Sequence, residues 1–276
     1  MDPVFILGCG YTGSRVARLL LDQGIDVGGS ARTLKSLAPL KERGLRPVAF
    51  DATDPRDLSR LEASLEPRTR LLYSIPSLTG AEGRWEPARQ ILEELGPKLS
   101  RVVYLSTTGV YGSAAAVNEN TPPKPETERQ ELRVQAEQAV LSGPWKSLIL
   151  RPAAIYGPGR GVQAALPQGK YKLAGDGSNF VSRIHVDDLA SILAAALLSD
   201  LTGAYPVADE EPCSSREIAE FCAELLQLGP VESVTSDELS ETRRSDRRVG
   251  GRAIRKLLGV TLQYPSYRQG VPASIG

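Results

Sequence analysis

Short apolar runs alternate with longer amphipathic segments through most of this chain. The strand-like runs predict strands at Val4–Leu7, Ile25–Ser30, Arg46–Phe50, Arg70–Ser74, Val102–Ser106, Ser147–Arg151 and Ala204–Val207. The amphipathic runs predict helices near Ser14–Gln23, Leu34–Arg43, Asp57–Leu65, Trp85–Leu95, Glu126–Leu141 and Asp188–Leu198. This alternation is typical of an α/β fold in which helices cover both faces of a parallel sheet.

Turn and capping residues predict where several of these helices end. Gly24, Gly44 and Gly143 each follow a predicted helix, where a left-handed residue is expected. Asp187 precedes another helix and is expected to cap its N-terminus. The alternation weakens from about Gly161, before a capped amphipathic helix at 214–228. We therefore expect a dinucleotide-binding domain at 1–160, continued by 184–208, and a smaller substrate-side lobe at 161–183 and 209–276.

A glycine-rich motif follows the first strand. Gly8-x-Gly10-x-x-Gly13 ends that strand and begins the first helix inside a βαβ unit, the context in which the motif is informative. Gly8 and Gly10 allow a tight turn and close approach to a pyrophosphate, and Gly13 allows close packing of helix on strand. The free N–H groups of a helix N-terminus attract the anion. The motif predicts a Rossmann-type, doubly wound sheet that binds a dinucleotide, and the alternative is a plain glycine-rich connection.

The end of the second strand bears on the choice between NADP and NAD. An NAD site usually places a carboxylate there, whereas this strand ends in Gly28-Gly29-Ser30-Ala31-Arg32. Arg32 could bind a 2′-phosphate with two charge-assisted bonds, and Ser30 could add another. NADP is therefore the expected cofactor, with NAD as the alternative. Arg32 could also be simply a solvated arginine at a strand end, without a role in binding.

Composition excludes several other classes. The 276 residues contain 33 Lys and Arg against 33 Asp and Glu, so no net field favours nucleic acid or an anionic membrane. The longest apolar run, 192–198, is too short to span a bilayer, and the N-terminus lacks the pattern of a secretory signal. The cysteines, Cys9, Cys213 and Cys222, lack metal-ligand spacing. We expect a reduced, cytoplasmic protein without bound metal.

Four motifs in order give the chain a family resemblance. They are the glycine-rich motif, Ser106-Thr107-Thr108-Gly109-Val110-Tyr111-Gly112, Leu150-Arg151-Pro152 and Ile184-His185-Val186-Asp187-Asp188-Leu189-Ala190. Together they resemble the extended short-chain dehydrogenase/reductase family, also called the NAD-dependent epimerase/dehydratase family, over nearly the whole chain. The resemblance implies cofactor contacts from Gly8, Gly10, Tyr11, Thr12, Gly13, Ser30, Arg32, Asp51, Ala52, Ser74 and Pro152.

Asp51 illustrates how an implied contact competes with a structural role. The family places an aspartate here to bind the adenine amino group, but Asp51 or Asp54 could equally cap the following helix. Ser74 ends the fourth strand where relatives wrap the cofactor.

The resemblance also implies a chemical site with one retained part and two altered parts. Relatives hold the reacting oxygen with a Ser or Thr three positions before Val-Tyr-Gly, which is Thr107 here. They also use a Tyr-x-x-x-Lys pair followed by Ala-Glu. Ala136-Glu137 supplies that register and aligns the tyrosine with Arg129 and the lysine with Arg133. The chain thus looks like an atypical member that lacks the pair.

An arginine cannot replace the tyrosine as a base, because guanidinium stays protonated up to a pH of about 12. Four residues apart on a helix, Arg129 and Arg133 could share a face and bind a carboxylate or phosphate. They could equally be solvated arginines paired with Glu128, Glu131 or Glu137.

Other groups could then carry the proton. Tyr111 is the first candidate and Tyr73 the second, although structural roles are the commoner outcome for both. His185, the single histidine, is expected to have a positioning role. Arg183 and Arg160 could contact an anionic substrate group.

A basic stretch at 243–248 is the one feature suggesting nucleic acid. It has no interleaved aromatic residue and the chain is charge-balanced, so we expect no nucleic-acid partner. The leading hypothesis is an oxidoreductase of the epimerase/dehydratase type, acting on a small carbonyl, hydroxyl or anionic metabolite. The alternative is a non-catalytic NADP(H) sensor. A homodimer is a family expectation only.

Overall fold

A computed structural model describes residues 2–80, 83–235, 238 and 245–275. By their internal contacts, residues 1–110, 125–151 and 190–204 form one compact unit, here called unit 1. Residues 111–124, 152–189 and 205–276 form the other, unit 2. Segments 111–124, 152–160, 184–189 and 205–208, which the sequence-based division grouped with the dinucleotide-binding domain, belong to unit 2.

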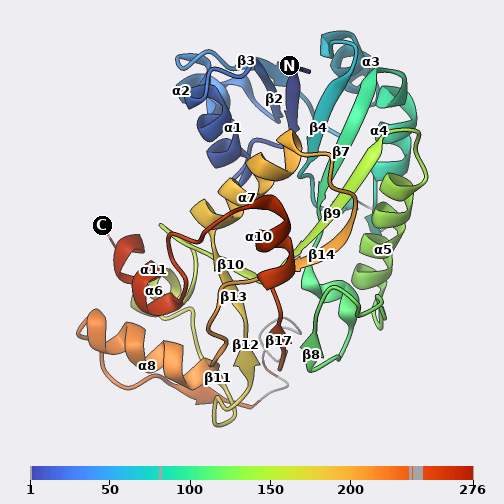
Figure 1. Ribbon diagram of the computed structural model, residues 1–276. Helices are drawn as coiled ribbons and strands as arrows, with labels where there is room; N and C mark the ends of the chain where they lie inside the picture. Colours follow the sequence, from blue (N-terminus) through green and yellow to red (C-terminus); the bar gives the residue numbers. More distant parts are fainter. Residues whose placement is uncertain (1, 81–82, 236–237, 239–244, 276) are drawn as a thin grey trace. The chain divides into compact units, whose positions relative to one another are not determined.

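A seven-stranded sheet organises unit 1 (Figure 1). Its strands lie in the order β14-β9-β7-β4-β1-β2-β3. Their bounds are β1 Val4–Leu7, β2 Val27–Ala31, β3 Arg46–Ala49, β4 Thr69–Tyr73, β7 Leu99–Leu105, β9 Lys146–Pro152 and β14 Gly203–Val207. The pairings of β1 with β2 and β4, of β2 with β3, and of β7 with β4 and β9 are parallel. Strand order reverses at β1, the switch point where doubly wound sheets bind ligands, so the predicted fold class is confirmed.

Helices cover both faces of this sheet (Figure 1). They are α1 Gly13–Asp22, α2 Ala38–Lys41, α3 Pro55–Ser64, α4 Ala88–Leu95, α5 Glu128–Leu141 and α7 Val186–Leu198, the last of which begins in unit 2. The apolar faces of α3, α4 and α5 bury a cluster that includes Leu61, Leu92 and Val140 against Tyr73 and Tyr104 of the sheet.

Two glycines in β2 make room for larger neighbours. A Cβ at Gly28 would lie 2.6 Å from Cδ2 of Phe5, and one at Gly29 would lie 2.6 Å from Sγ of Cys9. Protein interiors have no spare volume for such overlaps. The glycine pair therefore lets the first two strands pack closely beneath the glycine-rich motif.

Several predicted element ends need correction. Trp85 belongs to a short hairpin, β5 Leu78–Gly80 with β6 Gly83–Trp85, and not to the following helix. Gly24 and Gly44 have the expected positive φ, but Gly143 does not. Gly143 is needed for space, because a Cβ there would overlap the Trp145 ring. Asp187 lies in the first turn of α7 and is not its N-cap, since that helix begins at Val186.

Unit 2 consists of short strands and helices around its own core. Its elements are η3 Thr108–Tyr111 (in part), β8 Ala116–Val117, β10 Ala154–Tyr156, α6 Val162–Ala165, β11 Leu173–Ala174, β12 Phe180–Val181, β13 Arg183–His185, β15 Cys213–Ser214, α8 Ser215–Leu225, β16 Ser233–Val234, β17 Arg248–Val249, α10 Arg252–Leu258 and α11 Tyr267–Gly270. The helix predicted near 214–228 is confirmed as α8. Ser214 and Glu217 form a capping box at its N-terminus. Residues 243 and 244 of the basic stretch lie outside the described residues. Within the described part of the chain, no helix combines the length and apolar character that crossing a bilayer requires.

A buried arginine satisfies the end of α7 within unit 1. Arg101 on β7 is 1% exposed, and its Nε donates to the carbonyl of Ala196 at 2.9 Å. Its Nη2 donates to the carbonyl of Leu201 at 2.7 Å and to Oγ of Ser199 at 3.2 Å. Helix C-termini leave carbonyl groups without intrahelical partners. Arg101 therefore satisfies part of this buried end, and Nη1 of Arg70 on β4 donates to the carbonyl of Leu197 beside it at 2.9 Å.

Replacing Arg101 by methionine should destabilise the protein. We expect the free energy of unfolding to fall by about 1–3 kcal/mol, because the buried carbonyl acceptors lose their donor while the cost of burying the charge is removed. Urea unfolding followed by circular dichroism measures this change. Arg68→Met is the control, since its exposed pair with Asp2 should be worth less than about 1 kcal/mol. Equal effects of both substitutions would contradict the assigned role.

Candidate functional site

The glycine-rich loop leaves the space that a pyrophosphate needs. Gly8 has a φ of +104°, and a Cβ there would lie 3.2 Å from the carbonyl group of Ser74. A Cβ at Gly13 would overlap the carbonyl oxygen of Gly8, whereas one at Gly10 would meet nothing within 4 Å. The first turn of α1 contains no acidic side chain to oppose an anion. Gly8 and Gly13 are therefore required by close packing within the protein, whereas Gly10 has open space around it and no acidic side chain opposes an anion at the start of α1.

The residues expected at the adenosine end have different surroundings. Ser30 is 1% exposed, and its Oγ accepts from the amide of Gly8 at 3.3 Å. Its hydroxyl therefore supports the loop and does not face solvent as a 2′-phosphate ligand would. Arg32 is exposed at the end of β2. Asp51 follows β3, and hydrogen bonds from Thr53 and the charge of Arg32 lower the pKa of Asp51.

The capping alternative is settled in favour of Asp54. The side chain of Asp54 accepts from the amide of Arg56 and caps α3. Asp51 does not cap that helix, so its second carboxylate oxygen stays open to a ligand. The remaining expected cofactor residues vary in exposure: Thr12 and Pro152 are buried, and Tyr11, Ala52 and Ser74 are half-buried. Pro152 belongs to unit 2 and the others to unit 1.

Thr107 stands just beyond the carboxyl end of β7. Its side chain is half-buried, and its Oγ1 accepts from the amide of Gly109 at 3.1 Å. That bond uses an oxygen lone pair, so the hydroxyl proton can still be donated to another oxygen. Thr107 therefore keeps a hydroxyl proton available for donation.

A buried ion pair fixes the backbone next to Thr107. Glu137 of α5 and Arg151 of β9 are 3% and 5% exposed. Nη2 of Arg151 donates to Oε2 of Glu137 at 2.7 Å, and its Nε donates to Oε1 at 3.0 Å. Oγ of Ser106 also donates to Oε1, at 2.6 Å. This network, here called the Glu137 network, joins α5 to the ends of β7 and β9.

The two arginines at the altered positions do not act as a matched pair. Arg133 faces inward, and its Nη1 donates to the hydroxyl of Tyr104 at 2.6 Å. Arg129, one turn earlier, is exposed. Glu137 is engaged by Arg151 and so is not the partner of either arginine. Arg129 is thus a solvated arginine, whereas Arg133 is bonded within the protein interior.

Sequence reasoning missed two members of the Arg133 environment, Tyr104 and Glu86. Tyr104 is completely buried, and burial raises its pKa although Arg133 opposes the effect. Glu86 lies between β6 and α4, and burial raises its pKa too, with Arg133 again opposing. The available signal was the pair Glu86-Pro87 at the start of a helix, which predicts a capping role more readily than an interior one.

Unit 2 contains the other candidate side chains, of which Arg160 is exposed and three are buried. Tyr111 is 0% exposed. His185 is 1% exposed; its Nε2 lies 3.2 Å from Oγ of Ser274, and its Nδ1 accepts from the amide of Asp187. This agrees with the expected positioning role. Arg183 is 5% exposed and donates to the Val181 carbonyl, so it is not presented to an anion.

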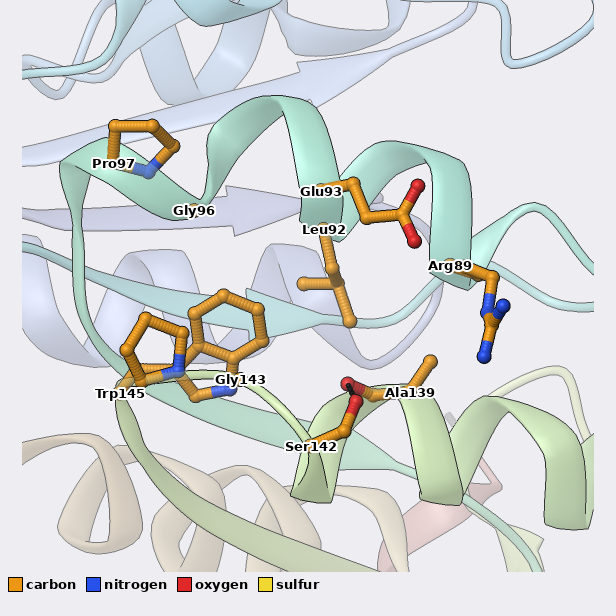
Figure 2. A pocket seen from close by; sticks show the side chains of 10 residues that line it. Arg89, Leu92, Glu93, Gly96, Pro97, Ala139, Ser142, Gly143 and Trp145 are labelled. Atoms are coloured by element: carbon orange, nitrogen blue, oxygen red, sulfur yellow. Dashed lines mark hydrogen bonds between the residues drawn. The ribbon is translucent and has the colours of Figure 1, made fainter.

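A surface groove lies between α4 and α5, away from the predicted site residues (Figure 2). It has a volume of about 440 Å³ and is lined by Arg89, Leu92, Glu93, Gly96, Pro97, Ala139, Ser142, Gly143, Pro144 and Trp145. Nε1 of Trp145 donates to the carbonyl of Val140 at 2.9 Å, which fixes the ring beneath Gly143. None of the predicted cofactor or chemical residues lines this groove.

Breaking the Glu137 network from one side should be costly. We expect Arg151→Met to lower the free energy of unfolding by about 3–5 kcal/mol, because it leaves the Glu137 carboxylate buried and unpaired. The double variant Glu137→Leu/Arg151→Met should regain much of that loss, since it removes both charges. Denaturant midpoints of the single and double variants measure the coupling. A double variant less stable than Arg151→Met would rule this account out.

Comparisons with known proteins identify the family that the chain resembles. The sequence model of the NAD dependent epimerase/dehydratase family matches residues 81–207, which include Thr107, Arg129 and Arg133. A solved conserved protein of unknown function from Silicibacter pomeroyi is 31% identical, with a TM-score of 0.82 and coverage of 99% of this chain and 98% of that one. Protein YeeZ of Escherichia coli K12 is 26% identical over 96% of this chain and 97% of its own length.

A more distant structure shares the fold. UDP-glucuronic acid 4-epimerase from Bacillus cereus, solved with UDP-glucuronic acid and NAD, is 19% identical with a TM-score of 0.77. It covers 99% of this chain and 97% of its own.

Proposed function

The chain belongs to the NAD-dependent epimerase/dehydratase family, and we propose that it is an oxidoreductase that uses a nicotinamide dinucleotide to act on a small carbonyl, hydroxyl or anionic metabolite. The observation that carries the proposal is the combination, within unit 1, of a glycine loop shaped for pyrophosphate and Thr107 beyond the carboxyl end of β7. In parallel sheets with a switch point, this edge is where ligands bind.

The dinucleotide would supply hydride transfer when bound, and the residues of unit 1 would orient it. The glycine loop would hold the pyrophosphate, and the open oxygen of Asp51 would accept from the adenine amino group. Arg32 would bind a 2′-phosphate, because it is exposed and no carboxylate ends β2. This arrangement favours NADP over NAD.

Thr107 would hold the reacting oxygen of the substrate. Its hydroxyl can donate to a carbonyl oxygen while its own oxygen accepts from Gly109. The Glu137 network would keep this hydroxyl in place by anchoring the preceding residue. The exposed guanidinium of Arg129 would favour substrates that have an anionic group.

The second candidate is a non-catalytic sensor of the oxidised and reduced dinucleotide. It is favoured by the exposure of Arg129, where the family has its tyrosine, since no phenol then stands at that position. A sensor would bind cofactor without turnover and would change conformation or partner binding with the redox state. Hydride transfer to any member of a carbonyl and sugar panel excludes it.

Arg32→Ala should separate the two phosphate forms of the cofactor. We expect NADPH affinity to fall about 10–100-fold, the value of one or two charge-assisted hydrogen bonds, and NADH affinity to stay within about twofold. Isothermal titration calorimetry measures both. Arg43→Ala, which removes an exposed arginine paired with Asp22, is the matched control. Tighter binding of NADH than NADPH by the unmodified protein would refute the preference for NADP.

Thr107→Ala should impair chemistry and leave cofactor binding intact. We expect kcat on a substrate found in the panel to fall about 100–1,000-fold, as for loss of one donor to a reacting oxygen. The dissociation constant for NADPH should not change. Ser142→Ala, at an exposed position after α5, is the control. Full activity of Thr107→Ala would remove this residue from the proposed site.

A further inference from the structure

Four polar side chains gather where β4 and β7 end in unit 1. Tyr73 of β4 and Tyr104 of β7 are partners in the sheet register, and their ring centroids are 5.5 Å apart. Glu86, before α4, and Arg133 of α5 complete the group, here called the Glu86 cluster. Ser74, next to Tyr73, packs against Gly8 of the dinucleotide loop. The cluster therefore lies at the same sheet edge as the predicted cofactor site.

Half of this cluster is satisfied and half is not. Arg133 donates to Tyr104 at 2.6 Å, and Oε1 of Glu86 accepts from the amide of Ala88 at 3.2 Å. Oε2 of Glu86 and the hydroxyl of Tyr73 are both buried and lie beside each other, and neither makes a hydrogen bond of standard geometry to a described residue. Buried polar atoms are normally fully hydrogen-bonded. The Glu86 carboxyl group therefore has one oxygen with a standard hydrogen bond and one oxygen whose neighbour is the Tyr73 hydroxyl.

The pKa shifts within the cluster distinguish the Glu86 carboxyl group from the other three side chains. Burial raises the pKa of Glu86, with Arg133, the Ala88 amide and Tyr73 opposing. Burial and the Glu86 charge raise the pKa of Tyr73, and burial raises that of Tyr104. The phenols therefore keep their protons, and Arg133 keeps its own. Glu86, whose pKa is raised from its ordinary value, is therefore the member of the cluster that can exchange a proton.

We propose that Glu86 is the proton-exchange group of this site, in place of the tyrosine that α5 lacks, and that Arg133, fixed by Tyr104, is its neighbouring cation. The inference rests on the proposed oxidoreductase function and names the group that would balance its protons.

Oxidation of an alcohol at this site breaks the C–H and the O–H bond of the substrate. The substrate C–H bond breaks and its hydride leaves for the oxidised nicotinamide dinucleotide. The O–H bond breaks, its proton passes to the Glu86 carboxylate, and a C=O bond forms. The substrate is oxidised and the dinucleotide reduced; carbonyl reduction runs each transfer in reverse.

The test measures the protonation of Glu86 directly and needs no substrate. Carbon-13 NMR of the full-length protein, with glutamate labelled at the side-chain carboxyl carbon, follows each carboxyl group through a pH titration. Glu86→Gln assigns the Glu86 signal, and Glu86→Asp assigns it if the first variant does not fold. The titration is run on the protein alone, with NADP⁺ and with NADPH. Glu94→Gln, at an exposed position on α4, is the matched control.

The nicotinamide ring is positively charged only in the oxidised cofactor. If Glu86 faces that ring, NADP⁺ should weaken its proton binding about tenfold or more relative to NADPH, as a nearby opposite charge does. Calorimetry in buffers of different ionisation enthalpy should then show proton release on NADP⁺ binding. That release should be lost in Glu86→Gln and kept in Glu94→Gln.

The outcomes separate this inference from the function on which it rests. Tight binding of both cofactor forms with no difference in the Glu86 titration would overturn the inference and leave the proposed function standing. Absence of any dinucleotide binding would overturn both. If the Glu86 signal titrates as an ordinary exposed glutamate in all three states, the inference about Glu86 is also overturned.

Discussion

The buried pairing of Glu137 with Arg151 is the constraint on which the site in unit 1 depends. Taking two charges out of water is expensive, and the cost is recovered only when the geometry satisfies both groups. Here two guanidinium nitrogens and the Ser106 hydroxyl converge on one carboxylate. Because the three residues come from α5, β9 and the end of β7, their bonds fix the rotation of α5 about its axis. That rotation in turn decides which side chains of α5 face the sheet.

Arg133 faces inward as a direct consequence. It lies four residues before Glu137, so one helical turn places both on the same side of α5. Arg129 is one further turn away, beyond the cover of the sheet, and is exposed. The position that the predicted register assigns to the family's tyrosine therefore carries a solvent-exposed cation. Arg133, in contrast, lies beside a phenol, that of Tyr104 on β7.

Local features of this architecture could be predicted from the sequence, and long-range contacts could not. The glycine-rich loop, the parallel sheet covered by helices and the helix after Ser214 follow from short spacings and periodicities with a direct steric or capping meaning. Contacts between Arg133 and Tyr104, or between Tyr73 and Glu86, join residues whose proximity depends on strand register and helix rotation.

Errors in predicted element ends have the same origin. The sequence around Gly143 resembles a helix C-terminus, yet the glycine is required by the ring of Trp145 two residues later. Asp187 has the residue type of a cap but lies one residue inside its helix.

The placement of the aromatic residues gives the protein internal optical probes. The chain has two tryptophans. Trp85 is half-buried and directly precedes Glu86, whereas Trp145 is 9% exposed and fixed beneath the groove between α4 and α5. Indole emission depends on local polarity and on nearby charges, so the two fluorophores report on different parts of unit 1. Replacing either by phenylalanine would leave a protein whose intrinsic fluorescence follows a single, known location.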